Sequence, residues 1–170
     1  MNDKIILMGF MGCGKSTVGR ELAKRLDYQF IDLDDEIEKV ARTTISKIFE
    51  FKGESYFRKL ESKTLKSVLA KKGNIVIALG GGTPCYGENI KFINNYPSYY
   101  IKCGVDVLTK RLKKERSHRP IIAEQNTDEL RNFIKQKLQE RSLFYENADH
   151  ILVGARSVTD ICSRIIQLQK

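Results

Sequence analysis

The sequence of 170 residues has no tryptophan, three prolines and two histidines, and its four cysteines show no C-x-x-C spacing. So few potential ligands argue against a zinc site or a disulfide framework, and unpaired cysteines are typical of a reduced cytosol. No apolar run approaches the roughly 20 residues of a membrane span, and the apolar run at residues 5–8 leaves no room for a signal peptide before it. We therefore expect a cytoplasmic protein with no membrane partner.

The composition is otherwise ordinary, with 41% hydrophobic and 30% charged residues, but the formal net charge is +9. A chain of this length suits one compact domain. The excess of positive charge fits nucleic-acid binding, and it fits equally an enzyme whose ligands are anions. Aromatic and basic residues do not interleave as they do in nucleic-acid modules, so we expect small anionic ligands and no nucleic acid. We also expect a monomer.

Residues 9–16 read Gly-Phe-Met-Gly-Cys-Gly-Lys-Ser and fit the P-loop signature G-x-x-x-x-G-K-[ST]. An apolar run before the loop predicts a strand and helical spacing after it predicts a helix, which is the context that the motif requires. The alternative is a glycine turn with a solvated Lys15. In a P-loop, backbone amides hold phosphates, Lys15 reaches the β- and γ-phosphates, and Ser16 ligates Mg²⁺. The predicted nucleotide-binding residues of the loop are Gly12, Cys13, Gly14, Lys15, Ser16 and Thr17.

Residues 28–34 predict a second strand, which ends in two carboxylates, Asp32 and Asp34. Because they are two residues apart in an extended chain, their side chains point the same way. They lie at the end of the strand, where open α/β sheets bind ligands. The same acids suit the start of a helix, whose dipole favours negative charge, and both interpretations can hold at once. Phosphoryl transfer needs one acid near Mg²⁺ and another that orients the acceptor hydroxyl.

Residues 35–72 are predicted to be largely helical, with an interruption at Gly53. This is long for a crossover between neighbouring parallel strands, so we expect an added helical piece over the sheet edge. Arg58 and Glu61 are three residues apart and can pair on a helix. Taken alone, Arg58 would more often be a surface ion pair than a ligand contact.

The apolar run at residues 74–79 predicts a strand buried on both faces. Three glycines, Gly80 to Gly82, follow it and permit close approach of a ligand to the backbone, with a flexible turn as the alternative. Because this strand carries no acid, a bound Mg²⁺ must rely on Ser16 and Asp32.

The second half of the chain predicts helices at residues 88–96, from residue 105, from an N-cap at Thr127 to residue 145, and from residue 157, with strands at 98–102 and 150–153. Five strands separated by helices predict a parallel α/β sandwich. The basic segment 110–120 suits a lid that closes on phosphates, with Arg119 on a phosphate and Arg111 stacked on the nucleobase. A solvated, charged helix end is the alternative.

The combined pattern resembles the shikimate kinase family over nearly the whole chain. The P-loop alone is shared with many nucleoside triphosphatases, but the set of motifs together is specific. The resemblance rests on the P-loop, the D-x-D of Asp32 and Asp34, the F-R-x-x-E of residues 57–61, the glycine triplet, Arg119-Pro120 and the segment 140–149.

The resemblance implies a P-loop NTPase three-layer sandwich with a five-stranded parallel sheet in the order 2-3-1-4-5. It implies one kinase domain, residues 1–170, with a substrate-binding segment near 33–61 and a lid near 112–124. The implied reaction moves the γ-phosphoryl group of ATP, with Mg²⁺, to the 3-hydroxyl of shikimate. The products are shikimate 3-phosphate and ADP, on the route to chorismate and the aromatic amino acids.

The resemblance also implies a role for each site residue. Arginine forks suit carboxylates, so Arg58 and Arg141 would hold the carboxylate of shikimate. The implied catalytic residues are Lys15, Asp34 and Arg119, the metal ligands are Ser16 and Asp32, and Arg111, Arg119 and Arg156 join the P-loop in binding ATP. The implied substrate-binding residues are Asp34, Phe49, Phe57, Arg58, Glu61, Gly80, Gly81, Gly82 and Arg141.

Two positions depart from the family pattern. Leu143 stands where the family usually has proline, which leaves the placement of Arg141 less fixed, and Ile121-Ile122 replace the common leucines of the lid. The rival functions are a related kinase for gluconate or a nucleoside monophosphate, and a basic P-loop protein that acts on nucleic acid or as a GTPase switch. Two arginines with Asp34 fit a polyhydroxy carboxylate better than a nucleobase, and no N-K-x-D guanine signature is present.

Overall fold

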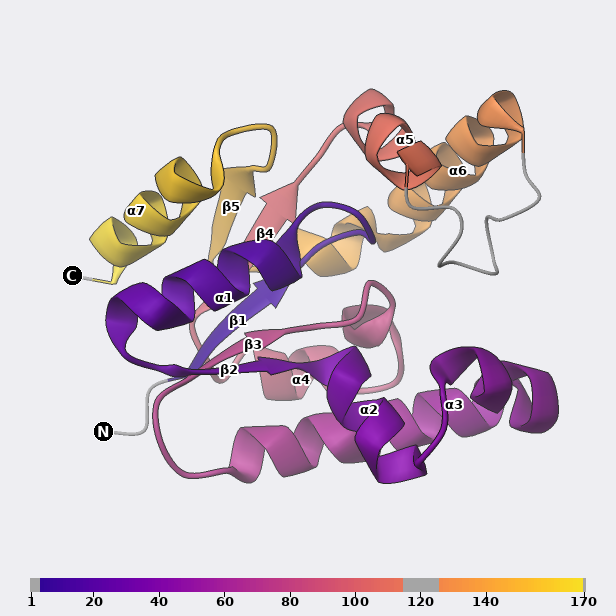
Figure 1. Cartoon of the computed structure of the whole chain (residues 1–170), viewed down its shortest axis with the longest axis horizontal. Coiled ribbons are helices and arrows are strands. Elements are labelled where there is room, and N and C mark those ends of the chain that lie inside the picture. The colour runs from indigo at the N-terminus through magenta and orange to yellow at the C-terminus, as the bar shows by residue number, and fades with distance from the viewer. Residues whose placement is uncertain (1–3, 115–125, 170) are drawn as a thin grey trace.

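A computed structural model describes residues 4–114 and 126–169 of the chain. Its centre is a parallel sheet with the strand order β2-β3-β1-β4-β5 (Figure 1), as predicted. The strands are β1 (Lys4–Met8), β2 (Gln29–Asp32), β3 (Ile75–Ala78), β4 (Ser98–Lys102) and β5 (His150–Val153). Within the described residues, no helix is long and apolar enough to cross a membrane.

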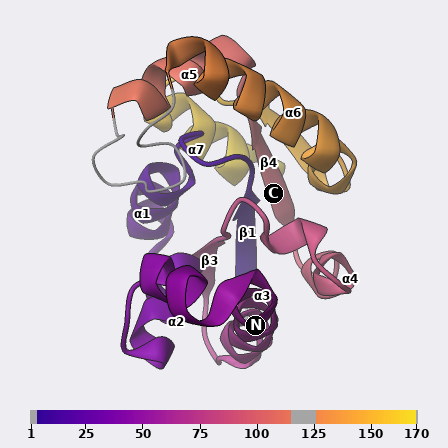
Figure 2. The same cartoon turned by 90° about the vertical axis from the view of Figure 1, so that its right-hand side faces the viewer.

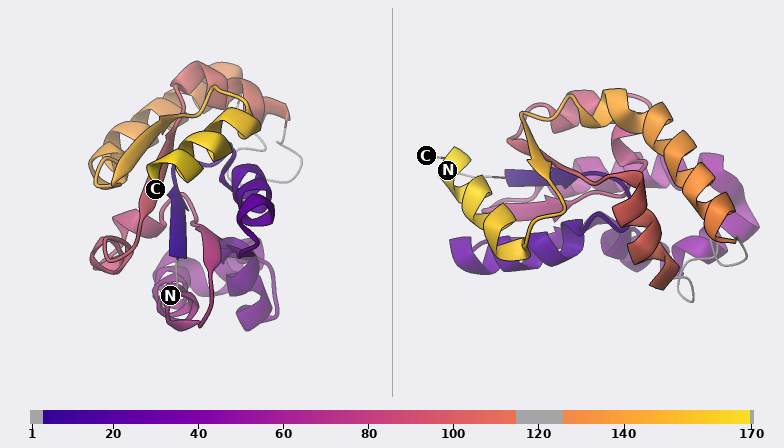
Figure 3. Two further views of the ribbon diagram at one scale, coloured as in Figure 1. Left: turned by 90° about the vertical axis from the view of Figure 1, so that its left-hand side faces the viewer. Right: turned by 90° about the horizontal axis from the view of Figure 1, so that it is seen from above.

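Helices cover both faces of this sheet and make the three layers of the sandwich. On one face, α1 (Lys15–Leu26) and α7 (Val158–Leu168) lie side by side (Figure 3). On the other face lies α4 (Asn89–Ile93) (Figure 2), and it packs against α3 (Ile45–Ala70). A short 3₁₀ turn, η1 (Thr83–Cys85), connects β3 to α4.

The two central strands, β1 and β3, are buried along their whole length. Strands covered on both faces are expected to be continuously apolar, and these two are nearly so. Lys4 lies opposite Ile75 and Leu7 opposite Ala78. This register makes β1 and β3 end at the same level, so the P-loop and the glycine triplet leave the sheet side by side.

Two helix pairs stand beyond the carboxyl ends of the strands, with the loops after β1 and β3 between them (Figure 1). One pair is α2 (Leu33–Ala41) with α3, and the other is α5 (Val105–Lys114) with α6 (Thr127–Tyr145). The predicted interruption of α3 is present at Gly53, whose φ of 75° and ψ of 172° break the helix. The first pair supplies the added helical piece expected over the sheet edge.

Two local predictions were wrong. The second strand does not extend to Asp34, because the side chain of Asp32 accepts a hydrogen bond from the Asp34 amide and starts α2 at Leu33. Asp34 therefore lies in a helical first turn, where the dipole favours its charge. The N-cap of α6 is Asn126 rather than Thr127, since the Asn126 side chain accepts from the amides of Asp128 and Glu129.

Candidate active site

The P-loop between β1 and α1 curls through three glycines with positive φ: Gly9 at 143°, Gly12 at 76° and Gly14 at 102°. Positive φ costs glycine nothing, and Gly14 is also the N-cap of α1. The Lys15 ammonium turns back into the loop, where it donates to the carbonyls of Gly9 at 2.9 Å and Phe10 at 3.0 Å. The loop thus holds its cation at the positive end of a helix, an arrangement suited to phosphate.

Ser16 and Asp32 meet as the sequence predicted. The Ser16 hydroxyl donates to Asp32 Oδ2 at 2.6 Å, while Asp32 Oδ1 accepts from the Asp34 amide at 3.1 Å. One carboxylate thereby joins the start of α1 to the start of α2. The carboxylate oxygens of Asp32 and the hydroxyl oxygen of Ser16 are hard oxygen ligands of the kind that Mg²⁺ prefers.

A cavity of about 370 Å³ opens over the P-loop. It is bounded by the P-loop, the ends of β2 and β3, and the loop after β5. Of the predicted site residues, its lining includes Gly12, Cys13, Gly14, Lys15, Ser16, Thr17, Asp32, Asp34, Gly80, Gly81, Arg111 and Arg156. The cavity is therefore lined by cations at the loop and by carboxylates at the end of β2, as a nucleotide with a divalent cation would require.

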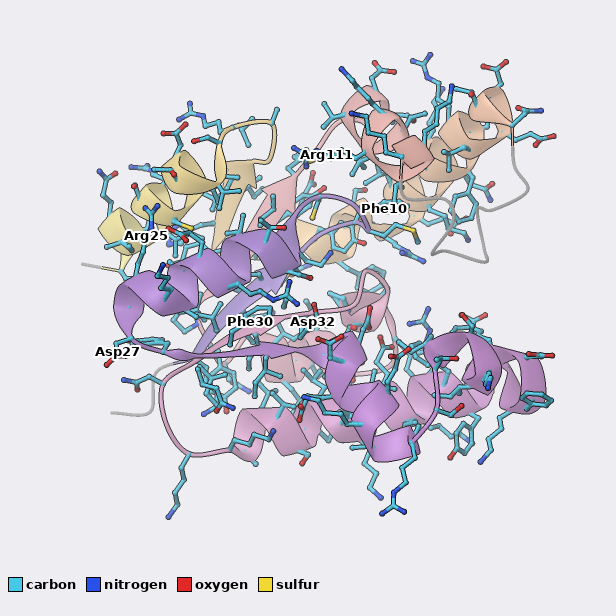
Figure 4. The ribbon with its side chains drawn as sticks, in the orientation of Figure 1. Phe10, Arg25, Asp27, Phe30, Asp32 and Arg111 are labelled. Carbon is cyan, nitrogen blue, oxygen red and sulfur yellow. The ribbon has the colours of Figure 1, made fainter. Side chains whose placement is uncertain are left out.

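Arg111 of α5 forms hydrogen bonds to two other segments that line this cavity, the P-loop and the loop after β5. Its Nη1 donates to the carbonyls of Gly12 at 3.3 Å and Cys13 at 3.1 Å, and its Nη2 donates to the carbonyl of Gly154 at 3.1 Å. Figure 4 shows Arg111 and Phe10 beside the loop between β1 and α1, with Asp32 at the end of β2. The first helix of the α5–α6 pair is thus tied to the P-loop and to the loop after β5.

The glycine triplet has backbone N–H groups that are available for hydrogen bonds to a ligand. Within the described residues, the amides of Gly80, Gly81 and Gly82 donate to no protein group, although buried amides are almost always paired. A Cβ on Gly82 would lie 2.6 Å from the terminal nitrogens of Arg58, and one on Gly81 would lie 3.4 Å from Nη1 of Arg141. The triplet therefore runs between two guanidinium groups with its amides available to a ligand.

Arg58 is held by a buried carboxylate. Its Nη1 donates to Glu61 Oε2 at 2.8 Å, and the Glu61 side chain is only 1% exposed. Thr83 donates to Glu61 Oε1 at 2.6 Å, and Asn89 donates to the Thr83 carbonyl at 2.9 Å. Burial acts to lower the pKa of Arg58, but the ion pair with Glu61 outweighs it and the pKa is raised. The predicted ion pair between Arg58 and Glu61 is therefore present and is largely buried, rather than a pair on the protein surface.

Aromatic rings support both arginines. The Phe49 and Phe57 rings pack with centroids 4.6 Å apart, and the Arg58 guanidinium lies 5.2 Å from the Phe57 ring. The Arg141 guanidinium lies 5.6 Å from the Phe10 ring. Cation–π contacts of this kind stabilise a guanidinium without neutralising its charge, which leaves that charge available to an anionic ligand.

The thiol of Cys85 lies near both guanidinium groups. Burial raises its pKa to about 11, although Arg141 and Arg58 act in the opposite direction. This thiol is therefore protonated near neutral pH and is a poor nucleophile. Cys85 therefore contributes a neutral group near the two arginines.

Leu143, the departure from the family pattern on α6, is 74% exposed. Its side chain faces outward and lines no part of the cavity, so the substitution alters the surface of α6 rather than the site. The other departure, Ile121-Ile122, lies outside the described residues, as do Arg119 and most of the predicted lid.

Sequence reasoning missed three buried residues that support the site: Thr83, Asn89 and Tyr145. Tyr145 donates to the Gly81 carbonyl at 2.5 Å. Thr83 donates to Glu61, and Asn89 donates to the Thr83 carbonyl. Only the folded chain brings this segment to Glu61. A weak signal existed for Tyr145, which follows Arg141 by four residues on a predicted helix and so shares its face.

Comparison with known proteins agrees with this geometry. A sequence model of the shikimate kinase family matches residues 11–170. A shikimate kinase of Flavobacterium johnsoniae is 41% identical over 169 residues, covering 98% of each chain. The crystal structure of shikimate kinase from Bacteroides thetaiotaomicron superposes with a TM-score of 0.94 at 35% identity, again covering 98% of each chain.

A further solved structure is a shikimate kinase from Acinetobacter baumannii in complex with shikimate. It superposes with a TM-score of 0.89 at 32% identity and covers 98% of this chain and 92% of that one. The motifs, the strand order and these likenesses extend over the same residues. This chain therefore belongs to the shikimate kinase family, whose members are ATP-dependent phosphotransferases.

Proposed function

We propose that this protein transfers the γ-phosphoryl group of ATP to the 3-hydroxyl of shikimate. The observation that carries the proposal is the glycine triplet running between Arg58 and Arg141 beside Asp34. A small acid with one carboxylate and several hydroxyls needs cationic forks, hydrogen-bond donors and a carboxylate in one place. The P-loop cavity adjoins this place through Gly80 and Gly81, so donor and acceptor would meet there.

Each group then has a distinct task. Arg58 and Arg141 would bind the carboxylate of shikimate, Phe49 and Phe57 would pack on its ring, and the free amides of the triplet would contact it. Asp34 would orient the attacked hydroxyl or accept its proton. Lys15 would exchange the loop carbonyls for phosphate oxygens and stabilise the charge that develops during transfer. Arg119 stays a predicted second cation for that charge.

A divalent cation fits the donor set of this site. Mg²⁺ is usually held by one or two carboxylates together with substrate phosphates and water. Ser16 and Asp32 already meet at 2.6 Å beside the P-loop. In the described part of the chain no three His, Cys, Asp or Glu side chains gather to hold a metal by themselves. We propose that Ser16 and Asp32 hold Mg²⁺ together with ATP. The phosphates of ATP would supply further oxygen ligands, and the cation would neutralise part of the phosphate charge.

The decisive assay is ADP release with Mg-ATP and one acceptor at a time: shikimate, gluconate, AMP, CMP or none. We expect turnover with shikimate alone, and loss of it when the divalent cation is chelated. Turnover with gluconate or a nucleotide would keep the P-loop and reassign the two arginines. Bound ATP without acceptor-dependent turnover would overturn the proposal, and a salt-sensitive gel shift with DNA or RNA would then favour the nucleic-acid alternative.

Replacing Gly82 with alanine should weaken shikimate binding selectively. The φ of Gly82 is −97°, which any residue adopts, so the backbone is not strained. The new methyl group would lie 2.6 Å from the flexible end of Arg58 and displace it. We expect KM for shikimate to rise about tenfold or more, since a bidentate charged contact is lost, while KM for ATP stays constant. Gly104→Ala is the matched control, because its φ is not positive and nothing lies within 4 Å of its Cβ position. Equal KM values for shikimate in the two variants would contradict this role.

A further inference from the structure

Tyr145 is the last residue of α6 and is completely buried, with 0% of its surface exposed. Its ring packs on Tyr100 of β4 with centroids 5.0 Å apart. Packing alone would be served equally by phenylalanine. The hydroxyl is therefore the part that needs an explanation, because burying a hydroxyl costs free energy unless it is hydrogen-bonded.

The Tyr145 hydroxyl lies between two groups of the candidate site. It donates to the carbonyl of Gly81 at 2.5 Å, and the Arg141 guanidinium lies close to it, acting to lower the pKa of Tyr145 against the effect of burial. Arg141 and Tyr145 are four residues apart and lie on the same face of α6. This hydroxyl therefore lies between the second predicted substrate arginine and the glycine triplet, which is 59 to 61 residues before that arginine in the sequence.

The carbonyl of Gly81 belongs to the same planar unit as the amide of Gly82. In a trans peptide the carbonyl and the amide N–H point in opposite directions. A partner that fixes the Gly81 carbonyl therefore also fixes the direction of the Gly82 N–H, which donates to no protein group within the described residues. Tyr145 acts on both a guanidinium and an amide of the candidate site without touching a ligand.

We propose that Tyr145 is a positioning residue for shikimate, whose hydroxyl sets the Arg141 fork and the Gly81–Gly82 peptide at a fixed distance from each other. The proposal rests on the function proposed above. It explains why Arg141 is held although Leu143, two residues before Tyr145, faces outward at 74% exposure. Arg141 is fixed from the inside of α6, by Tyr145 and the Phe10 ring.

The test is Tyr145→Phe, which removes only the hydroxyl and keeps the ring against Tyr100. We expect KM for shikimate to rise about tenfold, because the Gly81 carbonyl is left unpaired and Arg141 loses the polar group that lies beside it. KM for ATP should stay the same, and calorimetric titration with shikimate should show the same loss in Kd. The matched control is Tyr100→Phe, which removes a buried hydroxyl from the other ring of the pair; that hydroxyl makes no hydrogen bond within the described residues.

Three results would overturn the inference: an unchanged KM for shikimate in Tyr145→Phe, an equal rise in both KM values, or the same effect in Tyr100→Phe. A double-mutant cycle guards against a purely structural effect. If Tyr145 acts through Arg141, Tyr145→Phe should weaken shikimate binding less in an Arg141→Ala background than alone, whereas additive losses would contradict the proposal. Absence of shikimate turnover in the unmodified protein would instead overturn the proposed function.

Discussion

Asp34→Asn is expected to lower kcat with shikimate by about 10²–10⁴-fold, the usual contribution of a positioned acid–base group. Asparagine keeps the size of the side chain but cannot take a proton from the attacked hydroxyl. Asp34 is well placed for this task, because its amide is tied to Asp32 and its Oδ1 lies 2.8 Å from where a Cβ on Gly80 would be. Steady-state turnover across a range of pH checks the prediction.

Asp35→Asn is the matched control, since it makes the same chemical change one residue further along α2. Asp35 is exposed and lines no part of the cavity, so its variant should turn over shikimate normally. Binding of ATP, measured by calorimetry, should be unchanged in both variants. Near-normal kcat in Asp34→Asn would exclude proton acceptance and leave Asp34 only the task of orienting the hydroxyl.

Arg58→Ala is expected to raise KM for shikimate about 100-fold, because a bidentate contact to the carboxylate is lost. The same variant should also unfold more easily. Glu61 is 1% exposed and, among the residues that the structure describes, would keep only Thr83 as a partner. Removing one member of a buried ion pair typically costs about 3–5 kcal/mol. Kinetics with each substrate varied, together with thermal unfolding, measure the two effects separately.

The double variant Arg58→Ala/Glu61→Ala separates binding from stability. Removing both charges should recover part of the lost stability, because no buried carboxylate is left unpaired, while shikimate binding should remain weak. Arg58→Lys should recover charge but not the planar fork, and so only part of the affinity. A parallel loss of ATP and shikimate binding in Arg58→Ala would contradict the assignment of Arg58 to the acceptor.

Residues that interact at short sequence separation could be predicted. The P-loop is a local strand, turn and helix, and the Arg58–Glu61 pair follows from helical spacing. The start of α2 could not be settled in advance, because Asp32 suits both the end of a strand and the cap of a helix. Its side chain takes the capping role, and that choice moves Asp34 from an extended to a helical backbone.

Contacts between distant segments were outside the reach of pattern reasoning. Thr83 meets Glu61, and Tyr145 meets Gly81, only because the sheet register brings the end of β3 between two helix pairs. Tyr145 lies in the segment 140–149 that carries the resemblance, but its pattern there indicates only an apolar helix position, and Thr83 follows the glycine triplet as an ordinary turn residue. The hydrogen bonds that support the site therefore become visible only once the strands are aligned.

The hydrogen bonds of Arg111 bear on how the protein would distinguish one nucleotide from another. Its terminal nitrogens donate to the carbonyls of Gly12, Cys13 and Gly154, and stacking on a base would use the planar face of the guanidinium. Every purine and pyrimidine has a π face, and stacking is tolerant of base identity. If Arg111 stacks on the base, it recognises the flat face of the ring rather than a pattern of hydrogen-bond donors and acceptors. Any preference for adenine must then come from other groups.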